Sequence, residues 1–449
     1  MNRLHCIILT LVICLASAGV TAAQTTSIWD LDDTSWYDED ESVFILSTEE
    51  QLRGLSSLTF NGYSFKGKTI RLANDVAINS EHSWTPIGAY PAEYEFCPFQ
   101  GTFDGQGHSI VLQSEFMQLQ YRMDNGSYCD LGIFGHIGIY GKVMNLHVDI
   151  QTPKVALGDD AAQTVSLGGI AGSSFGHIQN CTVSGKLVAA GQGYNFTRVA
   201  GILGEGFEES VVADCVNNMD IRGIRVSYVA GIVGRGTGMV IDRCINNGNL
   251  ELTDARGDGS GKLAGGIAGR FGAYSYGEAG ALTNCINSGK IITDATLYSC
   301  GGITGSNMGD IMIVNCGNCG DITSDSDAGG ISGLANHLDI CNCWNISRVM
   351  YSNGVEQEAL VGSIMFADDK PIESGYFCQE LCKSAWGKDM SHSEMNSTKL
   401  TQRLNRRAQE LTGIVTRYLE RDYGAYIPTV QTWTPGPDSV GHPVFTSSR

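Results

Sequence analysis

Basic residues are scarce in this chain. It has 29 lysines and arginines against 48 aspartates and glutamates among 449 residues, a formal net charge of −19. Phosphate groups repel such a surface, so the composition argues against binding of nucleic acid or anionic lipid. After the first two dozen residues, no stretch reaches the roughly 18 apolar residues of a membrane span. The mature protein is therefore not expected to span a membrane.

Proline and charged residues are also few, with 9 prolines and a charged fraction of 17% against 57 glycines. This composition suits a turn-rich all-β protein long enough to bury a continuous core. Residues 1–23 contain an early arginine, an apolar stretch and then small residues, which is typical of a secretory signal peptide. We therefore expect an exported protein, secreted or at the cell surface. Lipidation at Cys14 is a weaker alternative, because the residues before it are not small.

A repeated pattern runs from Leu131 to Ser347. Each copy has a glycine-rich apolar motif, then an apolar position usually held by cysteine, and often an asparagine two residues later. The motifs are LGIFG (131), LGGIAG (167), VAGILG (199), VAGIVG (229), AGGIAG (264), CGGITG (300) and AGGISG (328). The two columns are Leu146, Cys181, Cys215, Cys244, Cys285, Cys316 and Cys343, and Val148, Val183, Asn217, Asn246, Asn287, Asn318 and Asn345.

Such repetition predicts an all-β fold, a right-handed parallel β-helix in which each copy is one coil. Equivalent residues would stack about 4.8 Å apart. Cysteines would fill the interior as small hydrophobes, and asparagines would hydrogen-bond along their column. Glycines four residues past the cysteine would supply left-handed backbone. Short runs rich in β-branched residues predict strands at 249–253, 290–293 and 321–324.

The N-terminal run FILSTEEQL (44–52), FKGKTIRLAND (65–75), WTPIG (84–88) and FQGTFDGQGHSI (99–110), followed by LGIFG, resembles secreted bacterial proteins with GLUG motifs. These proteins are common on the surfaces of gut Bacteroidetes. The resemblance covers roughly residues 36–365 and an end pattern with a helix, Trp433 and GHPVF (441–445). It implies a right-handed β-helix in an adhesin-like surface product, but no particular reaction.

The flanks of the repeats predict short capping helices. A capping-box pattern at 47–50 precedes apolar residues at helical spacing, and residues 397–422 place Leu400, Leu404, Ala408 and Leu411 on one face. We therefore divide the chain into the signal peptide (1–23), an N-terminal cap with the first coils (24–130) and the GLUG-type repeats (131–365). The rest (366–449) would hold an irregular last coil, a linker and a C-terminal capping helix.

Two constellations resemble catalytic sites of polysaccharide-degrading enzymes on this fold. Asp159-Asp160 with Gly176-His177 resembles the polygalacturonase pattern, but the accompanying elements of that pattern are absent, and a solvated loop is the preferred interpretation. A lyase would need carboxylates for calcium and a basic proton acceptor. The acidic pairs are Asp325 with Asp327 and Asp368 with Asp369, the second beside Lys370; both are more simply solvated turns.

Cysteine offers further alternatives. The spacing of Cys316, Cys319, Cys341 and Cys343 permits a zinc site, but two of the four belong to the predicted interior column. Cys97 with Cys129, and Cys378 with Cys382, are better disulfide candidates than neighbours in the column. Arg256-Gly257-Asp258 matches an integrin-binding tripeptide but is more simply a turn.

The sequence therefore favours a non-catalytic secreted or surface β-helix that presents loops to a glycan or a host or surface protein. The expected contact region is the loop around residues 254–280, where Phe271, Tyr274 and Tyr276 would stack on a sugar. No catalytic residue, cofactor or metal is assigned, although calcium stays open. The alternative is a carbohydrate-active enzyme, a polysaccharide lyase or glycoside hydrolase, on the same β-helix.

Overall fold

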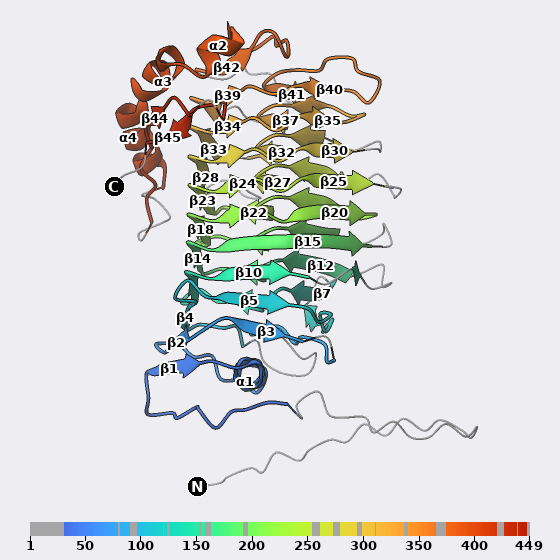
Figure 1. Cartoon of the computed structure of the whole chain (residues 1–449), viewed down its shortest axis with the longest axis vertical. Coiled ribbons are helices and arrows are strands. Elements are labelled where there is room, and N and C mark those ends of the chain that lie inside the picture. Colours follow the sequence, from blue (N-terminus) through green and yellow to red (C-terminus); the bar gives the residue numbers. More distant parts are fainter. Residues whose placement is uncertain are drawn as a thin grey trace, which may run out of the picture.

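The computed structural model describes residues 31–79, 81–89, 97–119, 121–123, 126–151, 154–157, 163–191, 196–253, 261–272, 279–293, 299–309, 311–335, 340–364, 374–419, 426–437 and 439–446. Short strands stack in parallel along one axis, from β1 near one end to β42 near the other (Figure 1). The strands facing the viewer in Figure 1 run from left to right as the chain climbs. The predicted right-handed parallel β-helix is therefore confirmed.

The strands form four stacked sheets, numbered in the order in which each coil meets them. Sheet 1 contains β1 (Val43–Leu46), β2 (Thr69–Leu72), β4 (Thr102–Asp104), β9 (Lys142–Met144), β14 (His177–Gln179), β18 (Val211–Ala213), β23 (Val240–Asp242), β28 (Gly280–Thr283), β33 (Ile311–Val314) and β38 (Ile340–Cys341).

Sheet 2 contains β3 (Val76–Ile78), β5 (Ser109–Leu112), β10 (His147–Ile150), β11 (Val155–Ala156), β15 (Thr182–Ala190), β19 (Val216–Asn217), β20 (Asp220–Ile224), β24 (Ile245–Asn246), β25 (Leu250–Thr253), β29 (Ile286–Asn287), β30 (Ile291–Thr293), β34 (Gly317–Asn318), β35 (Ile322–Thr323), β39 (Trp344–Asn345), β40 (Val349–Met350), β42 (Tyr376–Cys378) and β43 (Lys388–Met390). The strands expected at 249–253, 290–293 and 321–324 are β25, β30 and β35.

The glycine-rich motifs connect the last two sheets. Sheet 3 contains β6 (Tyr121–Met123), β7 (Gly126–Leu131), β12 (Gln163–Gly168), β16 (Phe196–Ala200), β21 (Tyr228–Ala230), β26 (Leu263–Gly265), β31 (Ser299–Gly301) and β36 (Ala328–Gly329). Sheet 4 contains β8 (Phe134–Ile137), β13 (Ala171–Ser174), β17 (Leu203–Gly206), β22 (Val233–Thr237), β27 (Ala268–Gly272), β32 (Thr304–Met308), β37 (Ser332–Ala335) and β41 (Val361–Ile364). One cluster of buried apolar side chains continues along the coils from Phe44 to Cys382.

The cysteine column lies inside this core. The thiols of Cys181, Cys215, Cys244, Cys285, Cys316 and Cys343 belong to residues with no exposed surface. Each thiol donates to a main-chain carbonyl, as Cys285 does to Thr283 O at 3.1 Å. Burial raises the pKa of the Cys285 thiol above its usual range, which keeps that thiol protonated. Cysteine here serves as interior packing, as predicted.

The asparagine column is a continuous hydrogen-bonded chain. Asn217, Asn246, Asn287, Asn318 and Asn345 are fully buried, and each amide of the first four donates to the Oδ1 atom of the next at 2.7 to 2.8 Å. The same amides also donate to main-chain carbonyls two residues further along their own coils. Each asparagine of the column therefore satisfies one buried main-chain carbonyl of its own coil.

The glycine-rich motif and the asparagine meet across the interior of the coil. A Cβ atom built on Gly231 would lie 2.3 Å from Cγ of Asn246, and one on Gly266 would lie 2.4 Å from Cγ of Asn287. Gly201, Gly302 and Gly330 face their asparagines at 2.3 to 2.4 Å in the same way. Glycine is required at these positions because the two chain segments approach too closely for any side chain.

The prediction for the glycines past the cysteine was correct at one position only. Gly185 has a φ of 105°, but Gly248, Gly289 and Gly320 do not have positive φ. Their Cβ atoms would instead lie 1.9 to 2.0 Å from a carbonyl oxygen of the preceding coil, so close approach explains them. In each repeat the residue directly before the core column has a left-handed backbone conformation, with φ of 51° to 61°. These residues are Asn145, Asn180, Asp214, Arg243, Asn284, Asn315 and Asn342.

Replacing Asn287 by leucine tests the asparagine column. Leucine fills a similar volume but cannot accept from Asn246 or donate to Asn318. We expect the free energy of unfolding to fall by about 1 to 3 kcal/mol, because buried groups on both sides lose a partner. Chemical denaturation measures this loss. The exposed Asn247→Leu should change stability far less, and equal losses in the two variants would contradict the role of the column.

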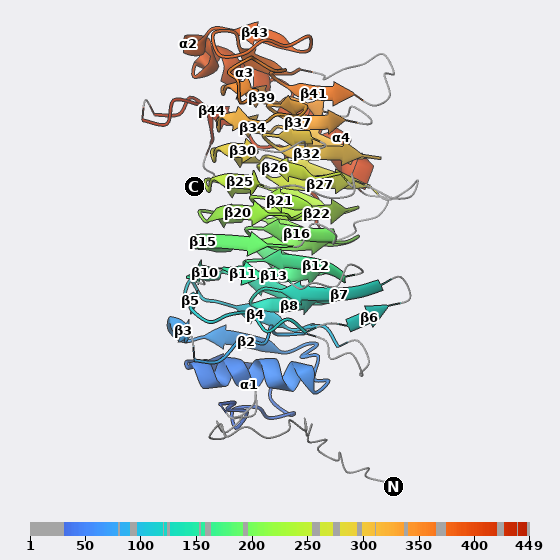
Figure 2. The ribbon, with the colours of Figure 1, turned by 90° about the vertical axis from the view of Figure 1, so that its right-hand side faces the viewer.

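The helices cover both the end and one side of the rod. Helix α1 (Glu49–Phe60) follows the N-cap Thr48, as the capping pattern predicted, and lies across the N-terminal end (Figure 2). The single C-terminal helix expected over 397–422 is instead two, α3 (Thr398–Asn405) and α4 (Ala408–Leu419), preceded by α2 (His392–Met395). The helix breaks where the carbonyl of Leu404 accepts from the side chain of Asn342.

Helix α2 lies at the C-terminal end of the rod (Figure 1), whereas α4 packs against the outer face of sheet 1. Its Leu411, Val415 and Leu419 join outward-facing residues such as Val240 and Met312 in one apolar cluster. The extended segment that follows includes β44 (Trp433–Thr434), which pairs antiparallel with β45 (Val444–Phe445). The backbone of this segment bonds to the left-handed asparagines Asn284 and Asn315.

Candidate functional site

The predicted sugar-binding loop is partly corrected by the structure. Phe271 lies in β27 and is fully buried in the core cluster, so its ring is not available to a ligand. Ala268 and Phe271 of this strand are fully buried, whereas Arg270 between them is only partly buried. Tyr274 and Tyr276 lie outside the described residues.

The hydrolase pattern cannot be assembled from the described residues alone. Asp159 and Asp160 lie outside them, whereas His177 begins β14 on the outer side of sheet 1, in register with Lys142 and Val211. Burial, with a smaller contribution from Lys142, holds the pKa of His177 below its usual value. His177 is therefore neutral at physiological pH.

In the first acidic pair of the lyase pattern, Asp325 and Asp327 have different surroundings. Asp325 accepts hydrogen bonds from the amide and the hydroxyl of Ser352 in the next coil, and these bonds lower the pKa of its carboxyl. Asp327 faces a groove instead. Asp368, Asp369 and Lys370 lie outside the described residues. In the described part of the chain, no three side chains of the metal-binding types gather at one point.

The cysteines form neither the disulfides nor the zinc site that the sequence left open. Cys97, Cys129, Cys378 and Cys382 are all free thiols, so the disulfide candidates were wrong. Cys382 donates to the carbonyl of Cys378 instead. Of the zinc candidates, Cys316 and Cys343 belong to the interior column, while Cys319 and Cys341 are partly exposed. The Arg-Gly-Asp tripeptide lies outside the described residues.

A serine, a histidine and an aspartate meet between sheets 3 and 4. The hydroxyl of Ser173 lies 2.6 Å from Nδ1 of His136 and 2.6 Å from Oδ2 of Asp130. In a nucleophilic triad the aspartate orients the histidine through the ring nitrogen that faces away from the serine. Here serine and aspartate approach the same nitrogen, and all three residues are buried. This cluster is a buried hydrogen-bond network without the arrangement of a triad.

Next to this cluster, sheets 3 and 4 share a buried ion network that the sequence pattern did not indicate. Oε2 of Glu205 lies 2.8 Å from Nη1 of Arg198, and Oε1 lies 3.1 Å from Nη1 of Arg235. Burial lowers the pKa of Arg235 to about 10, even though Glu205 opposes that shift. Arg198 and Glu205 lie on consecutive strands of one coil, and Arg235 pairs with Glu205 from the next coil, so these three residues join two successive coils.

The described residues also form an open groove near the C-terminal end of the rod. After β40 the chain turns back so that Glu356 bridges antiparallel to Met350. Tyr351 N donates to Val355 O at 2.8 Å, and Gly354, with a φ of 84°, donates to Tyr351 O at 2.9 Å. This hairpin, residues 350–356, forms one wall of the groove.

Side chains of the following residues fasten the hairpin to its neighbours. Gln357 accepts from Ala328 N at 3.0 Å and donates to Ser324 O at 2.8 Å. The carboxylate of Glu358 accepts from the hydroxyl of Ser384 at 2.9 Å and from Ala385 N at 3.0 Å. The wall is therefore held by ordered hydrogen bonds on both sides.

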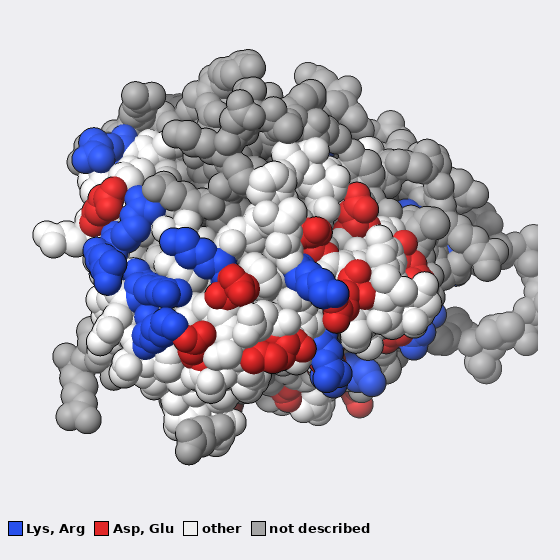
Figure 3. Space-filling view, turned by 90° about the horizontal axis from the view of Figure 1, so that it is seen from above, with Lys and Arg blue, Asp and Glu red and all other residues white. Residues whose placement is uncertain are grey.

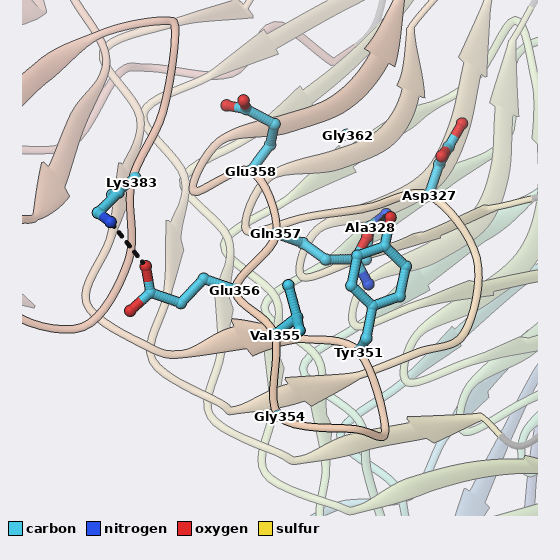
Figure 4. Close-up of a pocket in the computed structure, with 10 residues that line it drawn as sticks. All are labelled: Asp327, Ala328, Tyr351, Gly354, Val355, Glu356, Gln357, Glu358, Gly362 and Lys383. Carbon is cyan, nitrogen blue, oxygen red and sulfur yellow. Dashed lines mark hydrogen bonds and ion pairs between the residues drawn. The ribbon is translucent and has the colours of Figure 1, made fainter.

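The groove has a volume of about 660 Å³, within the range of roughly 300 to 1,000 Å³ typical of small-molecule sites. Figure 4 shows Tyr351 and Gln357 on one side of the wall, and Glu356 with Lys383 on the other. Oε2 of Glu356 lies 3.7 Å from Nζ of Lys383. The lining residues are Asp327, Ala328, Tyr351, Gly354, Val355, Glu356, Gln357, Glu358, Gly362 and Lys383.

Charges are unevenly distributed at this end of the molecule. Viewed down the axis, basic side chains gather on the side where α3 lies (Figure 3). Helix α3 and the residues after it contribute Lys399, Arg403, Arg406 and Arg407. The groove, in contrast, has three carboxylates and one amine. Cationic and neutral ligands are therefore favoured there over anionic ones.

No model of a known protein family matches the chain, and no curated protein matches it. The resemblance to GLUG-motif proteins therefore stays a prediction. Among the described helices, none combines the length and the apolar character needed to cross a membrane.

Two solved structures share features of the fold. One is a candidate immunoglobulin A1 protease from Bacteroides ovatus, at 17% identity and a TM-score of 0.46 over 91% of this chain and 94% of that one. The other is an IgA1 protease, at 12% identity and a TM-score of 0.43 over 78% of this chain and 26% of that one. Similarities this distant assign no activity to the chain.

Proposed function

We propose that this chain is an exported β-helix protein that binds a glycan or a host or surface protein without catalytic turnover. The groove beside the hairpin carries the proposal, because it combines an aromatic ring, carboxylates and an amine on a hydrogen-bonded scaffold. Aromatic rings that stack on sugars and polar groups that fix orientation are typical of such sites. The loop with Tyr274 and Tyr276 is a second proposed contact region.

The location and the family are parts of the same proposal. The apolar segment of residues 1–23 supports export, and the resemblance to GLUG-motif proteins supports display at a bacterial surface. The acidic balance of the chain argues against nucleic acid as the partner.

A glycan array and a turnover assay on the same preparation test this function. We expect binding to one group of glycans and no release of products from pectin, alginate or host glycosaminoglycans. Immunoglobulin A1, the substrate named for both structural neighbours, is included and should stay intact. Depolymerisation that disappears in an Asp159→Asn, His177→Ala variant would replace this function by the glycoside hydrolase alternative. Absence of binding to any glycan or surface protein would also reject it.

A further inference from the structure

The groups in the groove differ in whether they are free to meet a ligand. The side chains of Gln357 and Glu358 form hydrogen bonds with neighbouring residues of the protein, which hold the wall in place. Within the described part of the chain, the carboxylate of exposed Asp327 and the hydroxyl of half-buried Tyr351 have no such partner. Ligand contact therefore falls mainly to Asp327 and Tyr351.

An aromatic ring and a neighbouring apolar side chain give this side of the groove a sugar-compatible surface. Val355, with 56% of its surface exposed, follows Tyr351 across the turn of the hairpin. In Figure 4 the Tyr351 ring lies between Val355 and Ala328, with Asp327 beyond it. A ring face of this kind attracts the C–H face of a pyranose and also a neighbouring cation.

The charge of the groove selects among sugars. Asp327, Glu356 and Glu358 outnumber Lys383, whose side chain is 88% exposed and lies on the far side of the wall from Tyr351. A uronic acid or a sulfated sugar would bring its anion toward these carboxylates and meet repulsion. A protonated amine would meet attraction instead.

We propose that the groove binds an oligosaccharide of amino sugars with free, protonated amines. Tyr351 stacks beneath one pyranose ring, and Asp327 accepts hydrogen bonds from its ammonium group. This inference rests on the proposed glycan-binding function and specifies its ligand class.

Titration calorimetry with three tetrasaccharides tests the ligand class. The probes are a glucosamine tetramer, its fully N-acetylated form and a galacturonate tetramer. We expect the free amine form to bind at least about tenfold more tightly than the other two, with affinity falling as added salt screens the charges. Its binding should also weaken at alkaline pH, where the amine is neutral.

Four variants assign the contacts. Asp327→Asn and Tyr351→Ala should each weaken binding of the glucosamine tetramer by about tenfold. Lys383→Gln removes a cation and should tighten binding by a few fold. Glu251→Gln, a half-buried carboxylate on sheet 2 paired with Arg222, is the matched control and should change nothing. Unchanged thermal unfolding shows that each variant is folded.

Changes in binding affinity opposite to those expected would overturn the proposal. Tighter binding of the galacturonate tetramer, or weaker binding of the glucosamine tetramer by Lys383→Gln, would show that the site selects anions. Equal binding of the acetylated and free forms would remove the role of the ammonium group but leave glycan binding intact. Failure of all glycans on the array would reject the proposed function itself.

Discussion

Replacing Cys285 by aspartate is expected to lower the free energy of unfolding by about 3 to 5 kcal/mol, one of the two largest effects predicted for this chain. Cys285 is fully buried between Cys244 and Cys316, and its thiol donates to the carbonyl of Thr283. An ionised carboxylate there would face carbonyl oxygens, sulfur atoms and the amide of Cys244, and no ion pair among the described residues places a cation beside it. A protonated carboxyl would avoid the charge only by shifting its pKa far upward, which also costs stability.

Cys285→Ala is the matched control. It removes only the sulfur and leaves a small cavity, so we expect a loss on the order of 1 kcal/mol in the same denaturation experiment. Thiol labelling of the native protein provides a second measurement, in which partly exposed Cys97, Cys319 and Cys341 should react before the column. Equal losses in the two variants, or rapid labelling of Cys244 and Cys285, would contradict interior packing.

Gly266→Ala should destabilise the protein by a comparable amount, although the change adds a single methyl group. The new Cβ atom would lie 2.0 Å from the carbonyl oxygen of Gly302 and 2.4 Å from Cγ of Asn287. The backbone at Gly302 cannot move away without shifting the next coil. The side chain of Asn287 cannot move away without breaking its hydrogen bonds. We expect a loss of about 3 kcal/mol or more, measured by chemical denaturation, because overpacking is added to a broken network.

Gly413→Ala is the control for this substitution. Gly413 lies inside α4, and the nearest atom to its added Cβ would be Nη1 of Arg417 at 3.7 Å. The change should therefore raise stability by about 0.5 to 1 kcal/mol, since alanine is the better helix former. If Gly266→Ala were tolerated as well as Gly413→Ala, the close contact between motif and asparagine would be wrong.

The interior of the rod could be predicted from the sequence because it repeats. Cysteine, asparagine and glycine recur at matching places in successive copies, and a parallel stack is the arrangement that gives all copies the same environment. The contact between Gly266 and Asn287 was not predicted, since it joins two columns across a coil. The left-handed residue was assigned to glycine, although asparagine before the cysteine, as at Asn284 and Asn315, carries an equally specific signal.

The surface features of the rod were less predictable from the sequence, because each of them occurs in one coil only and not in every repeat. Phe271 is surrounded by loop-like residues in the sequence, but the structure places its ring in the core cluster with no exposed surface. The position of α4 on the side of the rod depends on apolar residues far away in sequence, such as Val240 and Met312. The hairpin groove arises where Tyr351 and Asp327 of successive coils meet. Nothing in local spacing indicates such a meeting.

The asparagine chain also gives the rod a direction. The amides of Asn217, Asn246, Asn287 and Asn318 all donate toward the C-terminal end, and the last three also accept from the N-terminal side, so consecutive coils in this region present the same chemistry to one another. A whole coil is thus an interchangeable unit. Duplication or loss of one coil in phase would lengthen or shorten the molecule and leave each junction of the asparagine column unchanged. The distance between the two ends can therefore vary in evolution independently of the groove and of the end that carries α1.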